Sequence, residues 1–291
     1  MTTAERSSLI AIPAVVAVGA GLAAAGAHHG AALGLPVFAL AVAAAFIIQW
    51  VVFAPSYVAR TERFFDLTGS LTYIAVTVGV LVASPTPDLR SVLLAGMVLV
   101  WAARLGTFLF RRINRRGRDD RFDEIIPSFV RFLAVWTIQG LWVSFTAAAA
   151  WAALTSSRRV GLDPFLVTGT AVWLVGFAAE VVADAQKGRF RDDPANADRF
   201  ITTGLWSVSR HPNYLGEILV WVGVALVALP VLQGWQYVTL ASPLFVATLL
   251  TRVSGIPLLE AKADARWGGQ ADYEAYKHRT PLLIPSPFRK G

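Results

Sequence analysis

The feature that most constrains this chain is an N-terminal stretch without a single charged residue. From Ser7 to Ala59 the sequence contains no Asp, Glu, Lys or Arg. A helix needs roughly 20 consecutive apolar residues to cross the hydrocarbon core of a bilayer, so this stretch is long enough for two membrane spans. The chain is therefore expected to be an integral membrane protein.

Charged residues are scarce in the rest of the chain as well. They make up 15% of the sequence, whereas ordinary soluble domains contain about 25%. Uncharged windows recur from Leu67 to Pro87, from Phe132 to Ser157 and from Ile218 to Thr251. We predict eight membrane spans, at residues 8–27, 35–57, 66–83, 89–110, 130–154, 164–184, 213–231 and 235–254. The expected fold is an all-α, polytopic helix bundle that forms a single integral-membrane domain over residues 1–291. The part of this domain after Ser254 is expected to be an interfacial segment.

The first apolar segment is expected to stay in the protein rather than to be removed as a signal peptide. Only Arg6 beside Glu5 precedes it, and the apolar run continues far beyond one signal-peptide core. A tight hairpin is expected at 27–36, between the first two spans. The sequence has no cysteine, which excludes disulfides, thiolate metal sites and cysteine nucleophiles.

The distribution of basic residues predicts the orientation in the membrane. If successive spans alternate in direction, 23 of the 26 Lys and Arg residues fall on one side, and Arg90, Arg158 and Arg159 fall on the other. Cytoplasmic loops are enriched in Lys and Arg, so both termini of this multi-pass protein are expected in the cytoplasm, at the cell (inner) membrane. The basic run 111–118 is interpreted as a lipid-headgroup anchor. This asymmetry accounts for the net charge of +7, so no nucleic-acid partner is expected.

Two carboxylates lie near the end of the sixth predicted span. Glu180 and Asp184 are one helical turn apart, and like charges at this spacing repel each other mildly unless cations or donors lie opposite. Lys187, Arg189 and Arg191 follow and are suited to a phosphate group. The alternative is a frayed helix end with solvated charges.

The stretch "WSVSRHPNYLGE", residues 206–217, has the pattern of a helix start. Pro212 suits the first helical position because its missing N–H would be unpaired there. The free N–H groups of the first turn attract an anion such as a phosphate, and Arg210 can bind one bidentately. Asn213 and Glu217 lie one turn apart on the same helix. The alternative is a simple cap at the membrane entrance.

Three further polar groups lie in or next to predicted spans. Asp66 begins the third span, where desolvation would favour a neutral acid that can donate a hydrogen bond. Arg104, inside the fourth span, is its candidate partner, and a purely structural salt bridge is the alternative. Glu260 and Tyr276 lie on the interfacial segment, where Tyr is often a membrane-belt residue.

Other catalytic patterns find little support. No G-x-S-x-G elbow occurs, so serine hydrolysis is not expected. No H-E-x-x-H pattern occurs, and His28 and His29 are predicted on the opposite side from His211, so no metal site is expected. The carboxylates that gather on the predicted cytoplasmic side indicate instead a large polar ligand that enters from the cytoplasm.

The stretch "GLWSVSRHPNYLGEILVWVG", residues 204–223, resembles the steroid 5-alpha-reductase superfamily, especially its bacterial branch of largely uncharacterised membrane proteins. The resemblance continues through "WAARLGTFLFRR", "GFAAEVVADAQKGRF", "SGIPLLE" and "YEAYKHRTPLLIP" and covers about residues 60–285. Residues 1–34 look like an extra span before a seven-helix core.

The resemblance implies a reductase that transfers hydride from NADPH to the C=C of an enone lipid, either steroid-like or isoprenoid. The cofactor would enter from the cytoplasm and the lipid substrate from the bilayer, and no obligate protein partner is expected. The cofactor-binding residues implied by the motifs are Glu180, Asp184, Lys187, Arg191, Arg210, His211, Asn213, Tyr214, Glu217, Glu260 and Tyr276.

The implied catalytic residues depart from the pattern of steroid-reducing members, which polarise the ketone with a Gln-Glu pair and a tyrosine. Asp66 stands where the glutamate is expected, preceded by Phe65, and Trp101 takes the place of the tyrosine. Tyr73, two turns after Asp66, is the candidate substitute, and Asp66, Arg104 and Tyr73 form the expected catalytic set. A donor to the developing oxyanion contributes roughly 2.7–4 kcal/mol.

Two other classes of function remain open. Membrane isoprenylcysteine and phospholipid methyltransferases have a similar "RHPxY" turn and bind S-adenosylmethionine in a comparable place. A non-enzymatic lipid-binding protein is the other alternative. The reductase is preferred because Asn213 and Glu217 lie within "HPNYLGE", with "EVVAD" about 30 residues before them.

Overall fold

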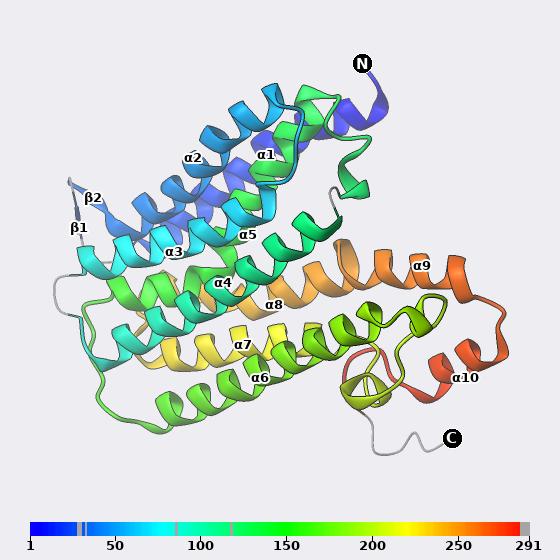
Figure 1. The fold of residues 1–291 in the computed structure, drawn as a ribbon. Coiled ribbons are helices and arrows are strands. Elements are labelled where there is room, and N and C mark those ends of the chain that lie inside the picture. The colour runs from blue at the N-terminus through cyan, green and yellow to red at the C-terminus, as the bar shows by residue number, and fades with distance from the viewer. Residues whose placement is uncertain (28–30, 33, 85–86, 117–118, 286–291) are drawn as a thin grey trace. The chain divides into compact units, whose positions relative to one another are not determined.

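The computed structural model describes residues 1–27, 31–32, 34–84, 87–116 and 119–285 (Figure 1). The described chain is almost entirely helical, which confirms the all-α, polytopic fold. Within these described residues, eight helical segments are long and apolar enough to cross a membrane: Thr3–Gly26, Val37–Val58, Phe65–Ala83, Leu89–Asn114, Phe129–Thr155, Pro164–Asp192, Pro212–Val231 and Gly234–Trp267. The protein is therefore a multi-pass membrane protein.

The helices follow one another in the order predicted from the uncharged windows. They are α1 (Thr3–Gly26), α2 (Val37–Val58), α3 (Phe65–Ala83), α4 (Leu89–Arg116), α5 (Phe129–Thr155), α6 (Pro164–Asp192), α7 (Pro212–Ala228), α8 (Ser242–Thr248), α9 (Ile256–Trp267) and α10 (Ala271–Arg279). The short strands β1 (Ala31–Ala32) and β2 (Leu35–Pro36) pair antiparallel between α1 and α2. They agree with the expected hairpin, although residues 28–30 and 33 of that segment lie outside the described residues.

The largest differences from the predicted spans are at the ends of α4 and α6 and within the last span. Helix α4 continues to Arg116 and α6 to Asp192, because Arg, Lys and Gln are good helix formers even where the sequence is too polar for a membrane. The last predicted span is not one regular helix. It consists of a 3-10 helix at Gly234–Ala241, then α8, then a π-helical turn at Leu249–Val253.

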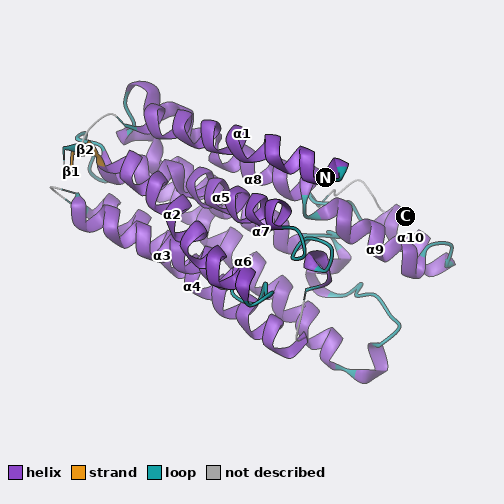
Figure 2. Ribbon diagram, turned by 90° about the horizontal axis from the view of Figure 1, so that it is seen from above, coloured by secondary structure: helices purple, strands orange, loops and turns teal. Residues whose placement is uncertain are grey.

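The described residues cluster into two compact units. The first comprises Met1–Val167 and Val224–Ser242. Within it α1, α2 and α3 pack against α5, and α3 packs against α4 (Figure 2). An alanine-rich stretch of α5 is buried at the centre of these helices, and the aromatic side chains of Phe53, Phe122 and Trp136 form a second buried cluster.

The second unit comprises Thr168–Gly223 and the segment from Pro243 onward. Its helices α6 and α7 run side by side (Figure 1) and touch through their backbones. A Cβ atom on Gly216 of α7 would lie 2.6 Å from the backbone N of Glu180 and 2.7 Å from the carbonyl oxygen of Gly176. Only glycine allows this close approach, so the two helices bring their polar ends together without intervening side chains.

Candidate functional site

A cluster of charged side chains lies at the start of α7, inside the second unit. A 3-10 turn, Gly204–Ser207, leads into Arg210 and His211, and Pro212 then begins the helix. Glu260 of α9 accepts a short hydrogen bond from Nη1 of Arg210, and its other oxygen lies 2.8 Å from Nε2 of His211. The turn "RHP" is thereby tied to a carboxylate far away in the sequence.

Burial favours the neutral imidazole form of His211. Its side chain is only 5% exposed, and this burial lowers the pKa of His211 although the hydrogen bond to Glu260 acts in the opposite direction. When Nε2 donates to the carboxylate, Nδ1 of a neutral ring becomes an acceptor. Nδ1 is buried and has no hydrogen-bond partner among the described residues. The ring stacks on Tyr214, with centroids 5.7 Å apart and planes 11° from parallel.

A second polar contact joins α6 to α7. Nδ2 of Asn213 donates to Oδ1 of Asp184 at 3.2 Å. Glu180 lies one turn earlier on α6 and is 3% exposed, and Glu217 lies one turn after Asn213 and is half-buried. The expected carboxylates and amide therefore converge at one end of the α6–α7 pair.

Trp206 organises the remaining polar groups of this unit. The ammonium of Lys187 lies 4.3 Å from the centroid of the indole ring, and the indole N–H donates to the carbonyl of Ala183. The hydroxyl of Tyr276 donates to the carbonyl of Trp206 at 2.7 Å. Burial raises the pKa of Tyr276 to about 12, so the phenol remains a donor. Arg191 is exposed near the end of α6.

The segment after α8 fastens this cluster in place. The backbone N–H of Arg210 donates to the carbonyl of Pro281 at 2.9 Å. Asp264 of α9 accepts from the hydroxyl of Tyr273 at 2.8 Å and from the ammonium of Lys277 at 2.6 Å. Helix α10 therefore holds α9, and with it Glu260, against the start of α7.

Two residues of this cluster were missed by the sequence analysis. Trp206 carries the contacts of Lys187 and Tyr276, and Gln186 accepts from the backbone N–H of Leu205 at 2.9 Å. Both residues lie inside the quoted motifs. Neither side chain is charged, so neither was conspicuous in the sequence, although the indole of Trp206 and the amide of Gln186 help to position the charged groups.

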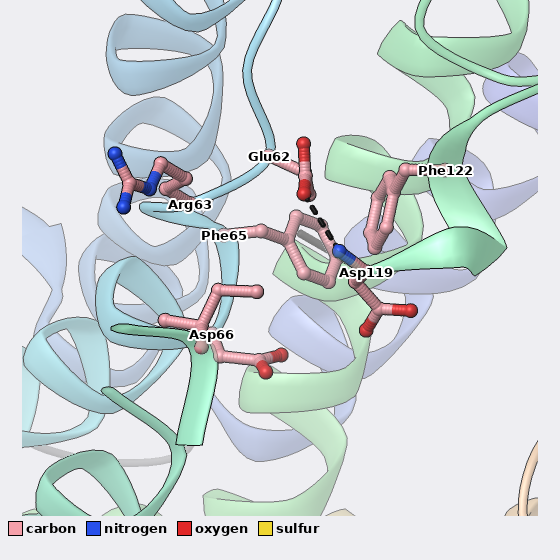
Figure 3. Close-up of a pocket in the computed structure, with 7 residues that line it drawn as sticks. Glu62, Arg63, Phe65, Asp66, Asp119 and Phe122 are labelled. Carbon is pink, nitrogen blue, oxygen red and sulfur yellow. Dashed lines mark hydrogen bonds between the residues drawn. The ribbon is translucent and has the colours of Figure 1, made fainter. Parts of the chain in front are cut away.

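The expected catalytic residues lie in the first unit, on α3 and α4. Asp66 is 26% exposed, and Oδ2 lies 3.3 Å from Nη2 of Arg112. It borders a small cavity that Figure 3 shows between the turn before α3 and the segment after α4. The cavity is lined by Glu62, Arg63, Phe65, Asp66, Ile113, Asp119 and Phe122. Its volume is about 10 Å³, which is enough for one water molecule and far too little for a lipid.

Glu62 fixes the wall of this cavity. Its carboxylate is 9% exposed and accepts from the backbone N–H of Asp119 at 2.9 Å (Figure 3). Burial alone would raise the pKa of Asp119, but hydrogen bonds from Arg121 and the charge of that side chain hold the pKa below its usual range. The segment after α4 is therefore anchored to the turn before α3 by this backbone hydrogen bond.

Arg112, the ion partner of Asp66, was assigned by the sequence analysis to a headgroup anchor. It lies two turns after Arg104, so both side chains start from the same face of α4. This spacing was the feature of the sequence that could have indicated Arg112 as a partner of Asp66. The guanidinium of Arg104 lies 5.3 Å from the ring centroid of Phe108.

Tyr73 lies beside the residue that replaces the expected tyrosine. Its ring meets Trp101 edge to face, with centroids 5.2 Å apart and planes at 89°. The side chains are 5% and 1% exposed. The phenol that the sequence analysis nominated as a substitute is therefore next to the position it would have to serve.

Comparison with known proteins identifies the family. Residues 50–280 match the family described as "Protein of unknown function (DUF1295)". The chain belongs to this family. The match begins inside α2, so α1 and the first half of α2 lie outside it.

Three characterised or named relatives share shorter stretches. The chain is 31% identical over 75 residues to 3-oxo-5-alpha-steroid 4-dehydrogenase 1 of Bos taurus, which is 26% of this chain and 29% of the relative. It is 29% identical over 123 residues to the protein of that name from Rattus norvegicus, or 42% of each chain. It is 33% identical over 91 residues to the probable O-methyltransferase ustE of Ustilaginoidea virens, or 31% of this chain and 32% of the relative.

These matches support the expected likeness to the steroid 5-alpha-reductase superfamily. The chain spans less than half the length of each of these relatives. No solved structure matches the chain. The assignment to a bacterial branch stays a prediction.

Proposed function

We propose that the protein is a membrane-embedded, NADPH-dependent reductase that adds hydride to the C=C of an enone lipid of steroid-like or isoprenoid type. The observation that carries this proposal is the convergence of Arg210, His211 and Glu260 with the Asp184–Asn213 contact in one unit. The similarity to two 3-oxo-5-alpha-steroid 4-dehydrogenases supports the choice of reaction class.

The chemistry of the cluster fits a phosphorylated nicotinamide cofactor. Nε of Arg210 and Nδ1 of His211 are both buried without a hydrogen-bond partner among the described residues. One is a charged donor suited to a phosphate oxygen, and the other is an acceptor suited to a hydroxyl or amide hydrogen. Lys187, three residues after Asp184 in the sequence, adds a second cation. When bound, NADPH supplies the hydride.

Each residue of the cluster then has a defined task. Arg210 binds phosphate, Asp184 orients the amide of Asn213, and Glu260 fixes the tautomer of His211 so that Nδ1 accepts from the ligand. Glu180 and Glu217, one turn away on each helix, bind hydroxyl groups of the same ligand. The hydroxyl of Tyr276 positions Trp206 by donating a hydrogen bond to the carbonyl of Trp206.

On the substrate side, Tyr73 donates a hydrogen bond to the enone oxygen. Trp101 packs against its ring and excludes water, which strengthens the bond. Asp66 and Arg104 supply the charged surroundings, with Asp66 anchored by Arg112. The proposed donor is worth roughly 2.7–4 kcal/mol in the transition state.

The proposal predicts that NADPH stabilises the full-length protein in gentle detergent. Arg210→Gln should weaken NADPH binding by about tenfold or more, because a hydrogen bond to a charged group contributes about 1.5–3 kcal/mol. The measurement is the thermal unfolding midpoint as a function of NADPH concentration. Arg199→Gln, which removes an exposed charge in the same unit, is the control and should bind as the wild type does. Equal affinities for both variants would remove Arg210 from the site.

The second candidate is an S-adenosylmethionine-dependent methyltransferase of the isoprenylcysteine or phospholipid type. It is favoured by the similarity to the probable O-methyltransferase of Ustilaginoidea virens. Parallel titrations with NADPH, NADH and S-adenosylmethionine separate the candidates. Stabilisation by S-adenosylmethionine alone would replace the reductase with the methyltransferase.

A further inference from the structure

A cavity of about 290 Å³ lies in the first unit, where α4 and α6 begin and the connection after α5 passes. None of its lining residues belongs to the proposed reductase site. Its lining consists of Asp88, Leu89, Arg90, Arg159, Val160, Gly161, Leu162 and Leu166. Pockets for drug-sized ligands start at about 300 Å³, so this cavity fits a small polar group and not a whole nucleotide.

Arg90 forms the fixed wall of this cavity. Its side chain is 2% exposed, and Nη1 donates to the carbonyl of Val227 at 2.6 Å. Nη2 donates to the carbonyl of Gly161 at 3.1 Å and lies 2.9 Å from a carboxylate oxygen of Asp163. Nε is buried without a hydrogen-bond partner among the described residues. Beside its ion pair with Asp163, the buried guanidinium therefore keeps one N–H that a further acceptor could take.

Arg159 brings a second guanidinium to the same cavity. It follows the end of α5 and is half-buried, and its Nη1 donates to the carbonyls of Ser156 and Arg158. These bonds fix the side chain over the connection that lines the cavity. The lining thus contains two guanidinium groups and one carboxylate.

The carboxylate, Asp88, is already engaged as a helix cap. One of its oxygens accepts from the backbone N–H of Ser91 at 2.8 Å and from the hydroxyl of Ser91 at 2.7 Å. Asp163 caps α6 in the same way through the backbone N–H of Leu166. Both helix starts therefore have their own caps, and the positive charge of the lining comes from side chains rather than from helix ends.

The mouth of the cavity is apolar. Leu89 is 63% exposed and Leu162 is 78% exposed; Leu89 is the first residue of a membrane-crossing helix, and Leu162 lies two residues before the next one, both in the cavity lining. The ends of a membrane span lie near the edge of the hydrocarbon core, where acyl chains meet headgroups. An anionic group held by the two arginines would thus have hydrocarbon beside it.

We propose that this cavity binds the phosphate of a membrane phospholipid. Nε of Arg90 donates to one phosphate oxygen, and the guanidinium of Arg159, a planar group suited to phosphate, binds the others. Leu89 and Leu162 contact the start of the acyl chains. The phospholipid site shares no residue with the proposed reductase site, and its test does not depend on NADPH binding.

The test uses full-length protein stripped of lipid in a neutral detergent. The thermal unfolding midpoint is followed against dihexanoyl phosphatidylglycerol, with dihexanoylglycerol and inorganic phosphate as parallel arms. The wild type should show a saturable rise with the phospholipid only. Arg159→Gln should need about tenfold more phospholipid, as expected for a lost hydrogen bond to a charged group.

The matched control is Arg158→Gln, which removes the neighbouring exposed arginine that does not line the cavity. It should respond as the wild type does. If Arg159→Gln does not fold, Arg159→Lys serves, and it should bind with intermediate affinity because lysine keeps the charge but lacks the fork. Equal responses of the position-158 and position-159 variants would overturn the site. Saturation by inorganic phosphate at the same concentration, or by dihexanoylglycerol, would overturn the assignment to a phospholipid.

Discussion

At the scale of single residues, His211 shows how one carboxylate can set the chemistry of a ring. Glu260 accepts a hydrogen bond from Nε2–H, burial favours the neutral ring, and Nδ1 is left as an acceptor inside the unit. The groups that face the ring are Glu260, Lys187 and Arg210. The two cations disfavour the charged imidazolium, and the carboxylate favours it.

The lowered pKa of His211 makes a prediction about stability and pH. Because the folded-state pKa lies below the unfolded value of about 6.5, the stabilisation is complete above that value and is lost as pH falls through the folded-state pKa. The free energy of unfolding of the wild type should therefore fall between pH 7 and pH 5 more steeply than that of His211→Gln. Chemical unfolding in detergent at several pH values measures the difference. Identical slopes would mean that the ring is not held neutral.

Some residues of the candidate site were predictable from the sequence, and others were not. Asp184, Asn213 and Glu260 were predictable because charged and amide groups are rare in membrane helices and therefore conspicuous. Arg112 was not assigned to Asp66, because a basic run after a span has a general explanation as a lipid anchor. Which of several arginines meets a given carboxylate depends on tertiary packing that one sequence does not display.

At the scale of helices, the α6–α7 pair is set by glycine. Hydrophobic run length predicted that both helices exist, but it did not predict that their backbones touch at Gly176 and Gly216. The ends of α4 and α6 were placed too early because the polar residues that end a membrane span do not end a helix. The irregular last span was missed because amino-acid composition does not distinguish 3-10 and π turns from a regular α-helix.

Gly216→Ala should separate α7 from α6. The new Cβ would meet backbone atoms of Glu180 and Gly176, which cannot rotate away, and overpacking of this kind costs about 1–3 kcal/mol. We expect a lower thermal unfolding midpoint and weakened NADPH binding, both measured in detergent. Gly79→Ala on α3 is the control, because a Cβ there meets nothing within 4 Å. An unaltered Gly216→Ala variant would show that the close approach does not exist.

At the scale of the whole molecule, the sequence specified a bundle of membrane helices and its order along the chain. The described residues form two compact units, and the single domain over residues 1–291 stays a prediction. The cofactor candidates lie in one cluster and the catalytic candidates in the other. Motif order along a sequence indicates membership of a family, but it does not specify which side chains share a packed unit.

The predicted orientation can be tested because the natural sequence contains no cysteine. Ser207 and Ser157 are both exposed, and they are predicted on the cytoplasmic and the opposite side respectively. In intact cells a membrane-impermeant maleimide should label Ser157→Cys and leave Ser207→Cys unlabelled until the cells are opened. The reverse pattern would place the cofactor candidates outside the cytoplasm and exclude NADPH from the cell interior as the ligand.

The proposed transfer of hydride from NADPH to a lipid can be measured directly. The direct measurement is to incubate the full-length protein in a lipid extract with NADPH deuterated at the transferred position, beside a parallel incubation with methyl-labelled S-adenosylmethionine. Mass spectrometry should find a lipid that has gained two hydrogens, one of them deuterium, and the product should be lost in Arg210→Gln. Transfer of the labelled methyl group instead, with no deuterium in any lipid, would contradict the account.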